Sequence, residues 1–392
     1  MKKILLGTTA LVTAGLLAGP ALASDPLKVT VGGNVVTGFY VIDADDVLGR
    51  SFESTKVALV ARNIDIKAEG TLDNGLVAGV DAKLQLNNDW NSGNASNIAN
   101  SSYASFRQLF AYLEGGFGRF EIGGTDGAAY KMHYTSPWFV PGNGVDSPNI
   151  YNGVSSGNFG FGPEVRTSTF SLMATDSNKI SYFTPRLAGF QLGVSYTPDA
   201  NDNNPKANRL VVLPNDFGMS NVFEIAANYA GTFSGVDIGV DGFYVTGDGG
   251  GSGLFWGTND VSPEEYGFGA NLGYAGFTLG GAWYQSNDLD YKYGVNLARK
   301  DYGAQVWTLG LKYATGPWTV GVAYLDAQDD SSSASGRDGR ESKTWQLGGG
   351  YNLGSGVDVG LDLQWAQNKH NNTWSSQTYD TKSAGLVLAV AF

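Results

Sequence analysis

The sequence predicts an all-β fold, a closed antiparallel β-barrel that spans a membrane, and three observations predict it. Residues 383–392 alternate between a face with Leu386, Leu388 and Phe392 and a face of mostly small residues. Beyond the first residues, no segment approaches the 18 consecutive apolar residues expected of a membrane helix. Short alternating runs, joined by links that are short and long in turn, fill the rest of the chain. A membrane protein without helical spans has the closed barrel as its other way across the bilayer.

The first residues predict a secretory signal peptide. Lys2 and Lys3 precede an apolar run over residues 4–18, which is shorter than the roughly 20 residues of a membrane span. Ala21-Leu22-Ala23 provides a small-x-small cleavage site. We therefore expect residues 1–23 to be removed, and residues 24–392 to form a single barrel domain.

Composition excludes several classes of protein. The chain of 392 residues has no cysteine, so an exported fold would have no disulfides. The predicted leader holds two lysines and no acidic residue, so its removal changes the formal charge from -12 to -14. Nucleic acid is therefore an unexpected partner, because phosphate binding needs a basic surface.

Sixteen strands are predicted from the alternating runs. The hairpin around Asp73-Asn74-Gly75 is the clearest, because Asn-Gly favours a two-residue β-turn. An even number of strands brings both ends of the sheet to the same side of the membrane, where the last strand can pair with the first. The expected strands cover residues 28–42, 55–71, 76–87, 104–114, 119–126, 176–184, 190–197, 221–229, 236–246, 265–274, 277–286, 304–313, 317–326, 343–352, 357–367 and 379–392.

Catalytic and metal-binding patterns are weak. His133 and His370 lie in different expected loops, and no serine or carboxylate is placed beside either in sequence. A zinc site is not predicted, because the chain lacks cysteine and paired histidines. The acidic group Asp43, Asp45 and Asp46 could bind calcium, but a solvated loop is the favoured interpretation. We expect no enzyme activity, no cofactor and no bound metal.

The long connection over residues 126–175 is the most informative segment. Long loops without regular structure are uncommon unless they have a function. This one contains several large apolar side chains, so we expect it to pack inside the barrel and narrow a channel, with packing on the rim as the alternative. Its charged residues are candidates for the constriction: Asp126, Lys131, Asp146, Glu164 and Arg166.

Basic residues on nearby strands complete the predicted pore lining. Alternation places Lys67 and Lys83 on the polar face of their strands, and Lys179 opposite in orientation to Ile180. Arg107 is a further candidate. Arg62 shares the face of Ile64, so a β-bulge or a subunit contact would be needed for it to reach the lumen.

Two stretches resemble the general diffusion porins of Gram-negative bacteria. Residues 112–124, Tyr-Leu-Glu-Gly-Gly-Phe-Gly-Arg-Phe-Glu-Ile-Gly-Gly, resemble the turn that precedes the constriction loop in that family. Residues 72–76, Leu-Asp-Asn-Gly-Leu, resemble a hairpin of the alphaproteobacterial branch. Phe392 resembles the terminal aromatic residue that the outer-membrane assembly machinery recognises. Residues 139–146 depart from the Pro-Glu-Phe-Gly-Gly-Asp stretch of many enterobacterial members, and Asp146 could replace its acid.

The resemblance implies a sixteen-stranded barrel in the outer membrane, a homotrimer with an inward-folded constriction loop. It implies passive diffusion of ions and small hydrophilic solutes, for which we expect a weak preference for cations. The expected partners are outer-membrane lipid, further copies of the chain, the solutes and the assembly machinery. A substrate-specific channel for sugars or phosphate is the alternative, followed by a barrel lipase.

Overall fold

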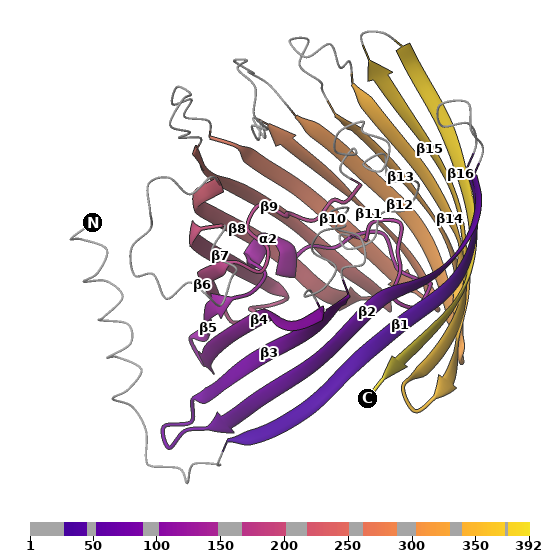
Figure 1. Ribbon diagram of the computed structural model, residues 1–392. Helices are drawn as coiled ribbons and strands as arrows, with labels where there is room; N and C mark the ends of the chain where they lie inside the picture. The colour runs from indigo at the N-terminus through magenta and orange to yellow at the C-terminus, as the bar shows by residue number, and fades with distance from the viewer. Residues whose placement is uncertain are drawn as a thin grey trace.

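The computed structural model describes residues 27–44, 52–88, 102–147, 167–200, 218–250, 262–287, 303–329, 339–372 and 375–392. The predicted signal peptide, residues 1–23, lies outside these ranges. Sixteen antiparallel strands form one closed barrel in which each strand pairs with its neighbours in sequence (Figure 1). The predicted fold class is therefore confirmed.

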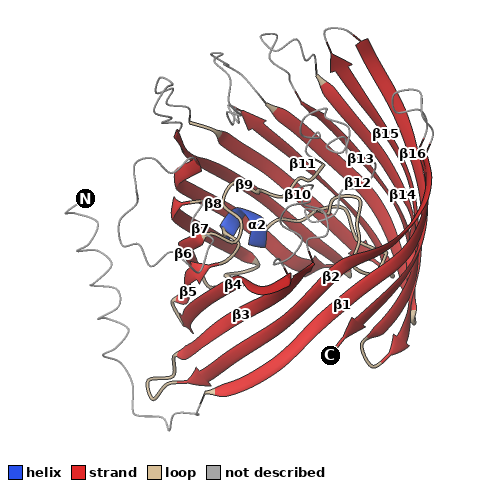
Figure 2. Cartoon of the chain, in the orientation of Figure 1, coloured by secondary structure: helices blue, strands red, loops and turns tan. Residues whose placement is uncertain are grey.

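The strands match the predicted runs and extend several of them. Their bounds are β1 (Lys28–Ala44), β2 (Phe52–Thr71), β3 (Val77–Asn88), β4 (Ser102–Gly115), β5 (Gly118–Gly124), β6 (Asn178–Phe183), β7 (Phe190–Asp199), β8 (Gly218–Phe233), β9 (Val236–Gly250), β10 (Glu264–Tyr274), β11 (Phe277–Asn287), β12 (Ala304–Thr315), β13 (Trp318–Asp329), β14 (Arg340–Gly354), β15 (Val357–Asn372) and β16 (Ser375–Ala391). One short helix, α2 (Ala128–Lys131), lies inside the barrel (Figure 2).

The first and last strands close the barrel as predicted. Their register runs from Asn34 opposite Ala391 to Ala44 opposite Thr381. Beyond β16, the Phe392 N–H donates to the Gly33 carbonyl over 3.0 Å, and the Gly33 N–H donates to the Phe392 carbonyl over 2.9 Å. Closure leaves neither strand as an edge with unpaired backbone groups.

The outer face of the barrel is apolar and carries aromatic rings at both ends. Near the short turns, Phe277 stacks on Tyr313 with ring centroids 4.4 Å apart, and Trp318 packs on Tyr351 at 4.5 Å. Toward the other end, Tyr324 packs between Trp307 and Trp345. Leucine, valine and isoleucine side chains are exposed on the strands between them. Such a band with aromatic borders fits a lipid bilayer and its two interfaces. Within the described ranges, no helix is long and apolar enough to cross a membrane.

Strands β5 and β6 are the shortest, with seven and six residues, because the chain leaves the wall between them. The strand predicted over 176–184 begins only at Asn178. Asp176 adopts a φ of 58°, a left-handed conformation that does not continue a strand. The loop between β5 and β6, described over residues 125–147 and 167–177, lies inside the barrel and contacts strands from β7 around to β15 and β1 (Figure 1). The prediction that this loop folds inward is confirmed for these residues, which we call the inner loop.

Candidate functional site: the barrel interior

Lys179 on β6 bonds to both legs of the inner loop close to the wall. We call residues 125–147 the outgoing leg and residues 167–177 the returning leg. Its side chain is 3% exposed. The ammonium donates to the Thr125 carbonyl on the outgoing leg, and to the carbonyls of Ala174 and Ser177 on the returning leg over 2.6 and 2.9 Å. A buried ammonium needs such acceptors to offset its lost hydration. The ammonium is thus enclosed by backbone rather than open to a channel.

A β-bulge turns Arg107 toward the same region. The register between β3 and β4 shifts between Lys83 and Leu84, and Arg107 is the extra residue on β4. Its Nε donates to Asp176 over 2.7 Å, and Gln108 next to it donates to both Asp176 and Asp126 over 2.7 and 2.8 Å. Burial, together with the negative charge of Asp176, raises the pKa of Asp126.

Helix α2 is fixed against β7 and β8 through its backbone. The Ala128 N–H donates to Ser195 Oγ over 2.9 Å, and the Ala129 N–H donates to the Glu224 carboxylate over 3.0 Å. A Cβ at Gly127 would overlap that carboxylate. Glycine at residue 127 therefore lets the chain lie directly against the Glu224 carboxylate.

His133 occupies a closed position behind the helix, with a side chain 0% exposed. Its Nδ1 lies 3.0 Å from Asp241 on β9, and its Nε2 lies 3.0 Å from the Thr169 hydroxyl on the returning leg. The Tyr134 N–H also donates to Asp241 over 2.7 Å. The imidazole therefore links both legs of the loop to the wall.

Asp146 joins the same two legs further along and is 0% exposed. Hydroxyl groups of Thr135 and Thr169 donate to its carboxylate, as does the Thr169 N–H over 2.7 Å. Burial raises the pKa of Asp146, although these donors oppose the shift. The carboxylate that we predicted at the constriction is enclosed inside the loop.

Inward-facing glycines carry the outgoing leg across the wall. A Cβ at Gly269 on β10 would overlap the Tyr134 carbonyl, and one at Gly321 on β13 would overlap the Phe139 ring. The leg also lies close to Gly310 on β12, Gly348 on β14 and Gly360 on β15. The absence of side chains at these positions lets the loop backbone lie directly against the strands.

The tip of the loop is tied to the wall beside β1. Asn143 Nδ2 donates to Asp362 on β15 over 2.8 Å, and Gly142 packs against Val36 on β1. The Asp362 carboxylate also accepts bonds from Tyr40, Gln346 and Gln364. A fully buried carboxylate with several donors makes this a firm anchor.

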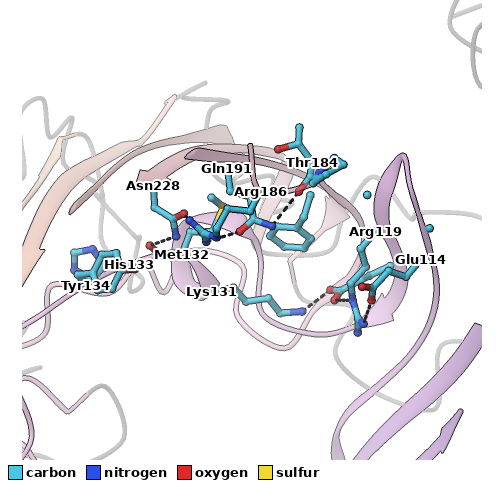
Figure 3. A pocket seen from close by; sticks show the side chains of 15 residues that line it. Glu114, Arg119, Lys131, Met132, His133, Tyr134, Thr184, Arg186, Gln191 and Asn228 are labelled. Atoms are coloured by element: carbon cyan, nitrogen blue, oxygen red, sulfur yellow. Dashed lines mark hydrogen bonds and ion pairs between the residues drawn. The ribbon is translucent and has the colours of Figure 1, made fainter. Parts of the chain in front are cut away.

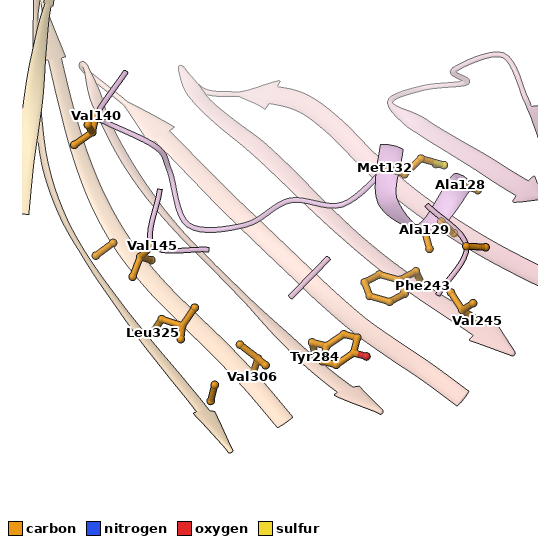
Figure 4. Packing of buried hydrophobic residues seen from close by; sticks show 14 of the residues in the cluster. Ala128, Ala129, Met132, Val140, Val145, Phe243, Val245, Tyr284, Val306 and Leu325 are labelled. Carbon is orange, nitrogen blue, oxygen red and sulfur yellow. The ribbon is translucent and has the colours of Figure 1, made fainter. Parts of the chain in front are cut away.

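Apolar side chains of the loop pack with buried residues on the inner faces of β8, β9, β11, β12 and β13 (Figure 4). Met132 and Val145 from the loop belong to one buried cluster with Phe243, Val306 and Leu325 from the wall. Each fully buried side chain of this size contributes roughly 1.5–3 kcal/mol. This side of the interior is packed like a protein core.

The opposite wall, made of β2 and β3, presents charged side chains to the interior. Asp65 lies opposite Lys83 in the register, and Lys67 lies opposite Asp81. Lys67 pairs with Glu69 over 2.8 Å, and these side chains are 44% and 41% exposed. This arrangement leaves polar, accessible surface between β2–β3 and the loop, where positive and negative side chains lie next to each other.

A cavity of about 590 Å³ lies under α2, toward the short turns (Figure 3). Its lining includes Arg119, Lys131 and Arg186, together with Glu114 and Glu121. Glu121 pairs with Lys131 and, over 2.8 Å, with Arg119; Arg119 also pairs with Glu114 over 3.0 Å. We call this space the short-turn cavity.

The predicted lining residues thus occupy different settings. Lys67 and Lys83 face the interior, and Lys131 lines the short-turn cavity, whereas Arg107, Asp126, Asp146 and Lys179 hold the loop in place. Glu164 and Arg166 lie outside the described residues. Arg62 stays on the outer face, opposite Val35, despite a bulge one step away.

Sequence reasoning missed several groups that position the loop or line the cavity: Glu121, Asp176, Arg186, Glu224, Asp241 and Asp362. Strand alternation would have placed Glu121, Glu224, Asp241 and Asp362 inward, since a carboxylate on an inward face of a barrel strand is visible in the pattern. Asp45, Asp46 and the side chain of His370 lie outside the described residues. Among the residues that are described, no group of three or more His, Cys, Asp or Glu side chains is placed to hold a metal ion.

Solved structures with this fold come from several bacteria. An anion-selective porin from Comamonas acidovorans superposes with a TM-score of 0.59 at 19% identity, covering 93% of this chain and 100% of that one. The outer membrane channel DcaP of Acinetobacter baumannii gives 0.61 at 12% identity, with 96% and 100% covered. A trimer form of OmpT, an outer membrane protein of Vibrio cholerae, gives 0.59 at 12% identity, with 94% and 100% covered. At these identities the likeness shows the fold.

Sequence relatives match shorter stretches. An uncharacterized protein of Rickettsia bellii is 28% identical over 142 residues, which are 30% of this chain and 31% of that protein. Another, from Rickettsia conorii, is 31% identical over 102 residues, 22% and 23% of the two chains. This chain therefore spans less than a third of the length of the curated relatives it matches. The family model described as Gram-negative porin matches residues 7–371, nearly the whole sequence, and confirms the resemblance. The chain belongs to the Gram-negative porin family.

Proposed function

We propose that the protein is a non-enzymatic channel of the outer membrane through which ions and small hydrophilic solutes diffuse passively. The observation that carries this proposal is the one-sided course of the inner loop. It covers the wall from β7 around to β15 and β1, and leaves the charged wall of β2 and β3 facing open space. Water and solutes would pass between that wall and the loop, where paired charges order water.

The residues proposed to line the passage differ from the first expectation. Lys67, Lys83, Asp65, Asp81 and Glu69 are the wall candidates, because they face the interior on uncovered strands. Lys131 and Trp138 are the loop candidates; Trp138 is 37% exposed between wall-packed neighbours. Glu164 and Arg166 stay candidates on sequence grounds alone.

A weak cation preference is proposed for the channel. The wall of β2–β3 carries nearly equal numbers of both charges, so the net acidity of the chain is its main support. An anion-selective porin shares the fold, so the fold itself does not fix the sign. In a planar bilayer under a KCl gradient, the conductance tests the channel and the reversal potential tests its cation preference. A steady open-channel current with a small cation-selective potential is expected; an anion-selective sign would remove the preference, and absence of current would remove the channel.

Export, assembly and oligomerisation complete the proposal. Residues 1–23 would be cleaved on export, residues 24–392 would form the barrel, and Phe392 would be read during assembly. A homotrimer is supported by the trimer form of a neighbour with the same fold and by Arg62 on the outer face of β2. A charge facing lipid is costly, so a subunit contact is the better setting for it. Light scattering of the purified protein in detergent should give a mass of three chains.

The alternatives have less support. A sugar channel would use a line of accessible aromatic rings; among the described residues, the large apolar side chains that are well exposed lie on outer faces, at turns or at the chain ends, apart from Trp138. A lipase would need an accessible histidine, and His133 is enclosed between Asp241 and Thr169. Loss of lipid hydrolysis on replacing His133 would favour the enzyme.

A further inference from the structure

Within the described part of the chain, no carboxylate pairs with Arg186, which lies at the edge of the short-turn cavity. It lies in the turn after β6, and its guanidinium donates to the Gly189 carbonyl over 2.7 Å and to Gln191 Oε1 and Asn228 Oδ1 over 2.9 Å each. All three of these acceptors are neutral. Arg119 and Lys131, in contrast, share the carboxylate of Glu121 (Figure 3).

The acceptors of Arg186 are themselves held in place. Asn228 Nδ2 donates to the Met132 carbonyl of the inner loop over 3.2 Å, and Gln191 Nε2 donates to the Thr184 carbonyl over 3.0 Å. The guanidinium is therefore oriented before any ligand arrives. Binding by a pre-organised group loses less side-chain entropy than binding by a mobile one.

The charge balance of the lining favours an anion. Three cationic side chains and two carboxylates line the cavity, so cationic side chains outnumber carboxylates by one. Guanidinium groups bind carboxylate and phosphate oxygens with strong charge-assisted hydrogen bonds, and two of the five N–H groups of Arg186 are not used by the three bonds above. The volume of about 590 Å³ lies within the range of small-molecule sites.

We propose that the short-turn cavity is a binding site for small solutes that carry an oxyanion group, a carboxylate or a phosphate, with Arg186 as the residue that binds it. The solute pauses there while it passes between the inner loop and the short-turn mouth of the barrel. This inference rests on the proposed channel function and gives that channel a solute class.

Single-channel recording in KCl tests the site with three probes, namely succinate, inorganic phosphate and neutral succinamide, added to each chamber in turn. The wild-type current should be interrupted by an anionic probe and unaffected by succinamide. In Arg186→Gln, the concentration that gives half-maximal interruption should rise about tenfold or more, the loss expected for a hydrogen-bonded charge. Lys312→Gln removes a lumen-side charge on β12 outside the cavity lining, so the anionic probes should interrupt its current as they do that of the wild type.

A second variant keeps the proposal testable should Arg186→Gln fail to fold. Gln191→Glu keeps the acceptor of Arg186 and neutralises its charge, so it should lose the interruption while the open-channel current persists. Interruption of the current by both succinate and phosphate supports an oxyanion site. Interruption by only one of them supports a site for that group, carboxylate or phosphate. Equal interruption in wild type and Arg186→Gln, or none in the wild type, would overturn the site. Absence of open-channel current would instead count against the channel itself.

Discussion

Gly269 and Gly321 let the inner loop lie against the wall, because a Cβ at either position would overlap Tyr134 or Phe139. Gly127 likewise lets the loop backbone lie against the Glu224 carboxylate. Single residues of the smallest type therefore decide how much of the lumen the loop occupies.

Gly269→Ala should push the loop backbone toward the axis. The overlap is with a carbonyl rather than with a flexible side chain, so we expect a smaller single-channel conductance and a loss of about 1–3 kcal/mol in the free energy of unfolding. Denaturant titration of the folded barrel in detergent measures the second quantity. Gly242→Ala on the outer face is the control, since its Cβ would meet its nearest atom at 3.8 Å; equal behaviour of the two variants would contradict the packing argument.

Asp126→Asn should stabilise the folded barrel at neutral pH. Burial and Asp176 raise the pKa of Asp126, so its ionised form costs the folded state stability above that pKa. The cost vanishes as the pH falls toward the ordinary value of 3.8, where the carboxyl is neutral in the folded state. The gain of the variant, measured by denaturant titration from pH 7 to pH 4, should therefore shrink with falling pH. A gain that grows as the pH falls would refute the assigned shift.

The two-residue alternation predicted which way side chains face on regular strands, and it failed where the strands are irregular. Lys67 and Lys83 were placed inward from the two-residue period alone. Arg107 depends on a bulge, and Asp176 on a left-handed backbone, and neither leaves a pattern in the sequence. The roles of Lys179 and Asp146 were unpredictable because they depend on contacts between segments that are distant in sequence.

Among the elements, the inner loop is bonded to the wall both at its base and at its tip. Lys179 and Glu224 hold its base, and Asp362 holds its tip through Asn143. Anchors on opposite sides of the barrel restrict the loop more than packing on one side would.

Asn143→Ala should loosen the tip. A hydrogen bond to a carboxylate contributes about 1.5–3 kcal/mol, and its loss should appear as greater noise in the open-channel current. Gln364→Ala removes a different donor from the same carboxylate of Asp362 and leaves the bond of Asn143 in place, so its current should stay quiet. Noise that rises equally in both variants would place the effect in the wall rather than in the loop.

At the scale of the whole molecule, the barrel is divided into a packed side and an open side. The loop and its apolar cluster fill the interior along β8–β14, and the charged faces of β2 and β3 stay accessible. The sixteen strands and their closure follow from local alternation and turn residues, which explains why they could be predicted. The division of the lumen could not, because it arises from contacts between the loop and strands far away in sequence.

Cysteine accessibility tests this division most directly, and the chain has no native cysteine to interfere. Lys67→Cys lies on the open side, and Thr308→Cys, at a residue 3% exposed beneath Ser136 of the loop, lies on the packed side. A charged, membrane-impermeant methanethiosulfonate reagent applied during single-channel recording should reduce the current of Lys67→Cys stepwise and leave that of Thr308→Cys unchanged. The division would be contradicted if the reagent modified Thr308→Cys rapidly and left Lys67→Cys unreacted.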